Sequence, residues 1–196
     1  FLDKDWLLFS MPSVVQTSEE FKVAMEAALP LLRARVADRY DIITVAQGGW
    51  LRLFSNRSLM EPENLVSARI GVSAKQEELA SQLQSLGART VKSDASSMLT
   101  HFSNGSIDIS YSSPLYVKLL WSQFRSSISY MSSFRLSPFF GALVFTKRAW
   151  ASVPADIKPA LIAAADKVAT EIATQAIALE EEAIAAMMKD GLKRRL

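Results

Sequence analysis

The sequence offers few side chains that could catalyse a reaction. His101 is the only histidine, and the chain has no cysteine. General acid–base and nucleophilic catalysis usually need partner groups within hydrogen-bond reach of one another. Neither a Gly-x-Ser-x-Gly turn nor a Gly-x-x-x-x-Gly-Lys phosphate loop occurs. We therefore expect a protein that is not an enzyme, and a hydrolase using His101 with a nearby serine is a weak third hypothesis.

The acidic run Glu180 to Glu182 is the densest group of possible metal ligands. It falls within a predicted helix, where successive side chains point in different directions. The absence of cysteine also removes thiolate metal sites. We interpret the run as a solvated helix face and expect neither a metal ion nor another cofactor.

Composition narrows the class of protein further. Hydrophobic residues make up 49% of the 196 residues, so the chain can bury a sizeable core. The net charge is only +2, and the sequence does not show the concentrated basic face that binding to nucleic acid needs. No run of eighteen uncharged apolar residues predicts a membrane span. The basic tail from Lys189 to Arg195 is interpreted as a helix end whose cations offset the helix dipole, ahead of contact with a membrane or partner.

Strands and helices alternate along the chain. The apolar opening, residues 1–12, is strand-like, and a helix is predicted to begin at Thr17 or Ser18 with a bend or break before Pro30. A strand over Ala68 to Ser73 and a helix over Lys75 to Leu86 follow. This alternation favours an α/β fold with a largely parallel sheet.

A long helix is predicted from about Asp156 to Lys189. At a rise of ~1.5 Å per residue, such a helix is about 45 Å long, more than the diameter of a small lobe. We therefore expect it to bridge two lobes. The predicted division is residues 1–45 in lobe I, 46–136 in lobe II, 137–153 as a strand returning to lobe I, and 154–196 as the bridging helix with its basic tail.

Several stretches resemble one family in order and spacing. They are GGWLRLFSN (48–56), PENLVSARIGV (62–72), LQSLGA (83–88), NGSIDISYSSP (104–114) and the segment from LVFTKRAW (143–150) through the long helix to Gly191. Together they resemble the periplasmic solute-binding subunits of tripartite ATP-independent periplasmic (TRAP) transporters. The resemblance implies a type II-like, two-lobed periplasmic binding protein that captures a solute and passes it to TRAP permease subunits.

Two departures from this family carry further expectations. Its members extend further at the N-terminus, so we expect this chain to lack an N-terminal segment, which could carry a lipid anchor. The divergence of this sequence from the family pattern also suggests a variant transport system, in which the binding subunit works with a TPR-repeat partner protein. In addition, the family arginine that clamps the carboxylate of an organic acid falls at Gly71, and Arg69 lies two residues before it.

The resemblance also predicts the ligand contacts. Asp108 matches a family aspartate that we interpret as structural, and the remaining positions are mostly apolar. They favour a hydrophobic, amphipathic or lipid-like ligand over a small acid. The expected ligand-binding residues are Trp50, Phe54, Arg69, Gly71, Tyr111, Ser112, Ser113, Arg135, Phe139 and Phe140. The alternative is an interaction or structural subunit of the same fold in which these aromatic side chains fill the cleft and no ligand binds.

Overall fold

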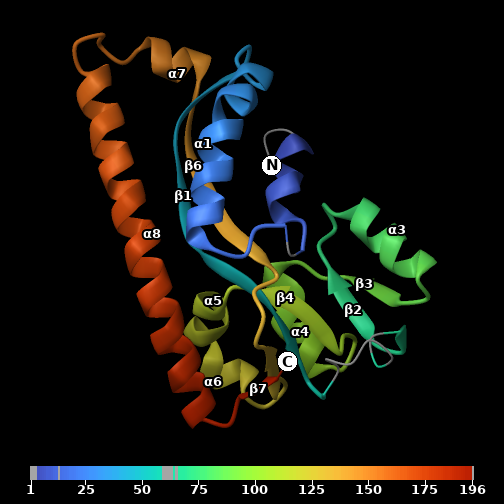
Figure 1. The fold of residues 1–196 in the computed structure, drawn as a ribbon. Helices are drawn as coiled ribbons and strands as arrows, with labels where there is room; N and C mark the ends of the chain where they lie inside the picture. The colour runs from blue at the N-terminus through green and yellow to red at the C-terminus, as the bar shows by residue number, and fades with distance from the viewer. Residues whose placement is uncertain (1–3, 13, 59–63, 65, 196) are drawn as a thin grey trace. The chain divides into compact units, whose positions relative to one another are not determined.

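The computed structural model describes residues 4–12, 14–58, 64 and 66–195. The chain divides into two compact units (Figure 1). Unit 1 comprises Phe1–Trp50 and Leu136–Leu179, and unit 2 comprises Leu51–Arg135 and Glu180–Leu196. The chain therefore passes three times between the units, after residues 50, 135 and 179. Part of the PENLV stretch, used above for the family resemblance, lies outside the described residues.

Unit 1 combines two strands with helices. Its elements are η1 (Lys4–Ser10), α1 (Ser18–Arg35), the first part of β1 (Tyr40–Ser55), β6 (Ser137–Thr146), α7 (Lys147–Ala151) and the first part of α8 (Lys158–Lys189). Strand β6 pairs with β1. The core of the unit holds Phe21, Met25 and Leu32 of α1 together with Trp6 and Phe9 of η1.

Two local expectations for unit 1 were wrong. Lys4–Ser10, within the segment expected to be strand-like, is a 3-10 helix, and the buried Trp6 and Phe9 lie three residues apart, which places both on one face of such a helix. Helix α1 is not broken before Pro30. Because Met25 and Leu32 are buried on either side of the proline, tertiary packing compensates for the missing hydrogen bond. Thr17 is the N-cap, as expected.

Unit 2 contains most of the sheet. Its elements are β2 (Arg69–Val72), α3 (Glu77–Ser85), β3 (Arg89–Lys92), α4 (Ala95–Ser103), β4 (Ile109–Ser112), α5 (Pro114–Leu119), α6 (Trp121–Phe124), β5 (Tyr130–Ser132) and β7 (Lys193–Arg195), with the ends of β1 and α8. The strand order is β3-β2-β4-β1-β5-β7. Strand β2 runs parallel to β3 and β4, and β5 runs parallel to β7.

The sheet is therefore mixed rather than largely parallel, because β1 runs antiparallel to both β4 and β5. A pattern of apolar residues predicts that a strand exists but does not reveal its direction within the sheet. The basic tail also differs from the expectation of a simple helix end, since Lys193–Arg195 forms β7 and pairs with β5.

Helix α8 is the longest element, and it belongs to both units (Figure 1). Residues up to Leu179 lie in unit 1, and those from Glu180 onward lie in unit 2. In unit 2, Ile184 and Met187 of α8 join a core with Phe54, Phe102 and Phe124. Among the described residues, no helix is both long and apolar enough to pass through a membrane.

Candidate functional site

The carboxyl ends of β3, β2 and β4 form one edge of the unit 2 sheet, because the three neighbouring strands are parallel. Open α/β sheets bind ligands outside the carboxyl ends of such strands. Polar residues lie at the end of each of these strands or shortly after it. We call the following residues the carboxyl-edge cluster: Ser73, Gln76, Ser93, Asp94, Tyr111 and Ser113.

Asp94 gives the carboxyl-edge cluster a negative charge. Its Oδ1 accepts a hydrogen bond from Ser73 Oγ at 2.6 Å and from the Ala74 backbone N–H at 3.3 Å. Asp94 is also the N-cap of α4, and its own backbone N–H donates to Ser97 Oγ at 3.1 Å. Its carboxylate in addition fixes the turn that follows β2.

Tyr111 supplies a neutral donor in the same cluster. Its hydroxyl donates to Gln76 Oε1. Burial is the main cause that raises the pKa of the Tyr111 hydroxyl, the charge of Asp94 raises it further, and a hydrogen bond with the Ser73 backbone opposes the shift. Tyr111 therefore stays protonated at neutral pH and can act as a hydrogen-bond donor.

The remaining polar groups of the edge hold local structure. Ser113 is the N-cap of α5, and its Oγ accepts a hydrogen bond from the Leu115 backbone N–H at 3.3 Å. His101 Nδ1 lies 3.0 Å from Ser93 Oγ. A serine nucleophile would also require a carboxylate that orients the histidine, and no carboxylate bonds to His101 within the described part of the chain.

Arg69 lies at the opposite end of β2 from this cluster. Its guanidinium forms a two-point ion pair with Asp108, with Nη2 2.7 Å from Oδ1 and Nε 2.9 Å from Oδ2. The Arg69 backbone N–H donates to Oδ2 as well, at 2.9 Å. The hydrogen bonds from Arg69 hold the pKa of the Asp108 carboxyl well below its usual range. The contact between Asp108 and Arg69 is thus structural, and it engages the Arg69 guanidinium.

Gly71 is closely packed on the side where a side chain would project. A Cβ atom at this position would lie 3.0 Å from Ser110 Oγ and 3.2 Å from Ile107 Cδ1. Ile107 belongs to the core of unit 2. A long side chain at residue 71 therefore requires Ser110 and Ile107 to move.

The other predicted contact residues fall into two groups. Trp50 and Phe140 pack in the core of unit 1, where the Phe140 ring stacks on Trp6, while Phe139 is 48% exposed and its ring lies against Gly48. In unit 2, Phe54 is fully buried in the core.

Tyr111, Ser112 and Ser113 lie together at the end of β4. The buried Ser112 is the register partner of Arg52 on β1. Arg135 is half-buried and is the last residue of unit 2 before the chain enters β6. Two of the ten predicted residues, Tyr111 and Ser113, therefore belong to the carboxyl-edge cluster.

Sequence reasoning missed Ser73, Gln76, Ser93 and Asp94 as members of this site. A usable signal was present, because Ser73 ends the strand predicted over Ala68 to Ser73 and Asp94 directly follows TVKS (90–93), a stretch with the composition of a short strand. Parallel strands bring their carboxyl ends to one edge. Nothing in the sequence indicated that Gln76 meets Tyr111. Among the described residues, no group of three or more metal-ligand side chains is arranged to hold a metal ion.

Solved structures share this fold. The chain matches a TRAP periplasmic solute-binding protein from Pseudomonas aeruginosa PAO1 with bound L-malate at a TM-score of 0.86 and 17% identity, over 99% of this chain and 68% of that one. DctP7 of Bordetella pertussis, a receptor binding pyroglutamic acid, matches at a TM-score of 0.85 and 19% identity, over 98% and 63%. A TRAP protein of Fusobacterium nucleatum with bound sn-glycerol-3-phosphate matches at 0.83 and 18%, over 97% and 62%.

The present chain therefore spans about two thirds of the length of these structures. A comparison with curated protein sequences gives no significant match. The family model for bacterial extracellular solute-binding protein, family 7 (DctP), matches residues 1–195. With this match over nearly the whole chain, the protein belongs to the DctP family of bacterial extracellular solute-binding proteins.

Proposed function

We propose that the chain is a periplasmic receptor that binds a small solute at the carboxyl-edge cluster and delivers it to the membrane subunits of a TRAP-type transporter. Membership of the DctP family and the fold shared with TRAP receptors support this proposal. The main observation that supports the location of the binding site is the set of polar groups at the carboxyl ends of three parallel strands. This is the edge at which open α/β sheets bind ligands.

The ligand is an uncharged, amphipathic molecule with a sizeable apolar part. The similar structures hold L-malate, pyroglutamic acid and sn-glycerol-3-phosphate. Such acids need a cationic partner, but Gly71 has no side chain and Arg69 is already bound by Asp108. The carboxylate of Asp94 also lies within the candidate site. An anion placed about 4 Å from that carboxylate would be repelled by roughly 4 kcal/mol at the dielectric typical of a protein surface.

Tyr111 and Gln76 fit a neutral polar group on such a ligand. The Tyr111 hydroxyl donates its proton to Gln76 Oε1, so its oxygen can accept a hydrogen bond from a ligand and the Gln76 side-chain N–H groups can donate one. The apolar part of the ligand would contribute ~25 cal/mol for each Å² of surface that it removes from water. Affinity therefore does not require an arginine clamp.

A ligand screen by thermal shift tests this proposal. Neutral amphiphiles such as acyl alcohols and acyl amides are expected to raise the melting temperature, whereas L-malate, pyroglutamate and sn-glycerol-3-phosphate are not. Tyr111→Phe should weaken binding of the best neutral compound by about tenfold, the effect of one lost hydrogen bond. Tyr116→Phe is the matched control, because the Tyr116 hydroxyl bonds to the backbone carbonyl of Ala95 outside the cluster. Micromolar binding of an anion, unaffected by Tyr111→Phe, would contradict the ligand class.

The family resemblance alone supports two further parts of the proposal. They are a lipid anchor at the N-terminus of the full protein and a TPR-repeat partner in its transport system. Mass spectrometry of the mature protein and co-purification from native membranes would test both. If neither an acyl chain nor a TPR protein were found, these two parts of the proposal would be wrong, but the proposed receptor function would not be affected.

A second candidate function is an interaction or structural subunit that keeps the fold and binds no ligand. The burial of Trp50 and Phe54 in the two cores, with Phe140 packed against the core of unit 1, favours it, because these aromatic side chains are then occupied by protein contacts. This candidate predicts that no compound in the screen shifts the melting temperature.

A further inference from the structure

Arg52 is a buried charged residue close to the point where β1 enters unit 2. It follows Leu51, the first residue of that unit, and its side chain is 1% exposed. Burial lowers the pKa of the Arg52 guanidinium and the charge of Glu180 opposes this shift, so the group remains charged. A buried guanidinium must be paired with acceptors, because an unpaired buried charge is strongly destabilising.

One set of acceptors lies just before the second crossing of the chain. Arg52 Nη1 donates to the backbone carbonyl of Ser133 at 2.6 Å and to those of Ser132 and Phe134 at 3.3 Å. The chain leaves unit 2 after Arg135, the residue that follows Phe134. Arg52 is thereby bonded to the last residues of unit 2 before this crossing.

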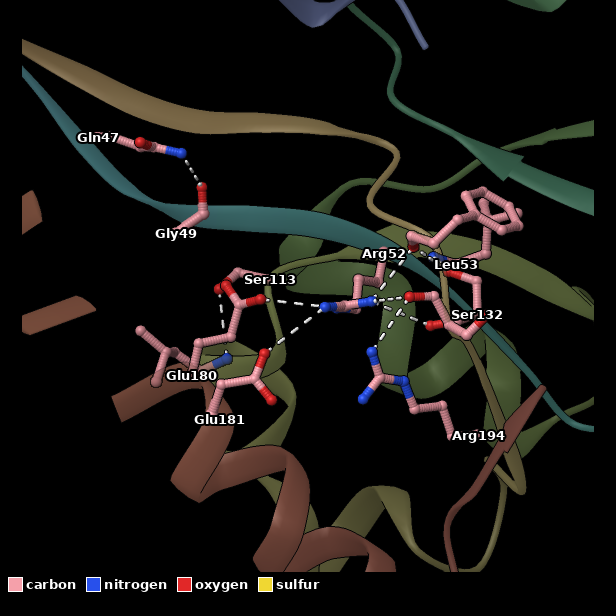
Figure 2. A network of polar contacts seen from close by, with 12 residues as sticks. Gln47, Gly49, Arg52, Leu53, Ser113, Ser132, Glu180, Glu181 and Arg194 are labelled. Atoms are coloured by element: carbon pink, nitrogen blue, oxygen red, sulfur yellow. Dashed lines mark hydrogen bonds and ion pairs between the residues drawn. The ribbon is translucent and has the colours of Figure 1, made fainter. Parts of the chain in front are cut away.

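Two carboxylates at the third crossing form ion pairs with Arg52. Arg52 Nε is 3.6 Å from Glu180 Oε1, and Nη2 is 4.0 Å from Glu181 Oε1. Glu180 is the first residue of α8 in unit 2, and its side chain is 1% exposed. The expectation of a solvated helix face was therefore wrong for Glu180, because the residue packs against the buried Arg52. Figure 2 shows the guanidinium of Arg52 between these carboxylates and the backbone near Ser132.

All three connections between the units therefore meet at a single side chain within unit 2. We propose that Arg52 is a positioning residue that holds three parts of unit 2 together. These parts are the end of β1, the segment that precedes β6, and the end of α8. The three connections then move as one body when the units move. The flat guanidinium suits this role because its donors point in fixed directions toward several acceptors at once. If one connection shifted while the other two stayed in place, Arg52 would lose some of its partners, and buried polar groups would be left unpaired. This proposal goes beyond ligand binding and does not depend on the identity of the ligand.

Single-molecule energy transfer in the ligand-free chain tests the proposal. Because the sequence contains no cysteine, Glu26→Cys on α1 of unit 1 and Gln82→Cys on α3 of unit 2 would accept two dyes specifically. The labelled wild-type chain is expected to give a single narrow distribution of distances. The double variant Arg52→Met with Glu180→Leu removes both buried charges together, which spares the fold because no charge is left unpaired. It should give a broader distribution or additional populations.

Two further variants make the outcome decisive. Lys92→Met with Glu77→Leu is the matched control, since it removes an exposed ion pair of unit 2 that lies away from the three crossings, and it should leave the distribution unchanged. Arg52→Lys keeps the charge but cannot serve both sets of acceptors, so it should broaden the distribution in a chain with native circular dichroism. If Arg52→Met with Glu180→Leu does not fold, Arg52→Lys alone decides. Wild-type distributions in the folded Arg52 variants, or equal broadening in the control, would overturn the proposal.

Discussion

Arg69 and Asp108 join the amino ends of β2 and β4 through a two-point ion pair in which both donor–acceptor distances are below 3.0 Å. Asp108 also accepts a hydrogen bond from the Asn56 side chain at 3.3 Å. Asp108 thus connects three segments of unit 2, and Arg69 is held at the edge of the sheet away from the carboxyl-edge cluster. The pair explains how the chain can keep an arginine two residues before Gly71 without offering it to a ligand.

Replacing Asp108 should reveal the pH dependence of this pair. The folded state lowers the pKa of Asp108 from its ordinary value of 3.8, so its stabilisation is fully present above that value and is lost as the pH falls below it. Asp108→Asn should therefore lower the free energy of unfolding at pH 7 by about 2 kcal/mol, typical of hydrogen bonds to a charged group. Urea unfolding between pH 7 and pH 2 should show the two proteins converging in acid. A constant difference over this range would contradict the assignment.

The neighbouring glutamates of α8 should differ strongly in their effect on stability. Glu180 is buried against Arg52, whereas Glu181 is 53% exposed. Glu180→Gln should destabilise unit 2 by roughly 3 kcal/mol because it leaves the buried Arg52 charge without its main partner. Glu181→Gln should cost less than about 1 kcal/mol, as for an exposed ion pair. The check is the urea midpoint, with Glu181→Gln as the control; equal losses would show that Glu180 is not the essential partner.

Tyr111 should make stability fall in alkali. Its pKa is raised above the ordinary value of 10.0 in the folded chain, so the unfolded chain ionises first and gains stability relative to the folded state as the pH rises above 10.0. The wild type should therefore lose stability more steeply than Tyr111→Phe over this range. The difference in tyrosinate absorbance between the two proteins should also show Tyr111 ionising late. Parallel stability profiles would show that the Tyr111 hydroxyl is not buried.

Thr17 should contribute measurably to unit 1. Its Oγ accepts a hydrogen bond from the Glu20 backbone N–H at 3.1 Å, and the Glu20 carboxylate accepts one from the Thr17 N–H at 3.2 Å. Thr17→Ala should cost about 1 kcal/mol of unfolding free energy. Thr174→Ala, on the exposed surface of α8, is the control and should be close to neutral. The prediction fails if both variants unfold at the same midpoint.

Strong local signals predicted much of the fold. The long C-terminal helix, expected from Asp156, begins at Lys158 and ends at Lys189, and its end is marked by Gly191 with a positive φ of 105°. The strand expected over Ala68 to Ser73 is β2. Both signals are local, since helix periodicity and strand length can be read from neighbouring residues.

Contacts between distant segments were harder to predict. Val168, Ile172 and Leu179 recur at helical spacing in the sequence of the long helix, a pattern typical of a buried face, yet they are between 44% and 50% exposed. The buried face is set by what packs against the helix. The buried position of Arg52 depends on acceptors about eighty and 130 residues further along the chain. No single-sequence pattern brings these residues together.

The candidate site divides in the same way. Tyr111 and Ser113 were predicted from a motif at the end of one strand. The contact of Tyr111 with Gln76, and that of Ser73 with Asp94, each join two connections that follow different strands. Predicting them requires the strand order, which the alternation of elements does not determine.

Native mass spectrometry of the protein purified without added ligand, followed by organic extraction, tests the central claim most directly. The expected result is one bound molecule that extracts into organic solvent, carries no charge at neutral pH and has a long apolar part. Tyr111→Phe should retain less of this molecule than Tyr116→Phe. A co-purified small organic acid would contradict the proposed ligand class, and a protein that is consistently empty and binds nothing would favour the interaction subunit over the receptor.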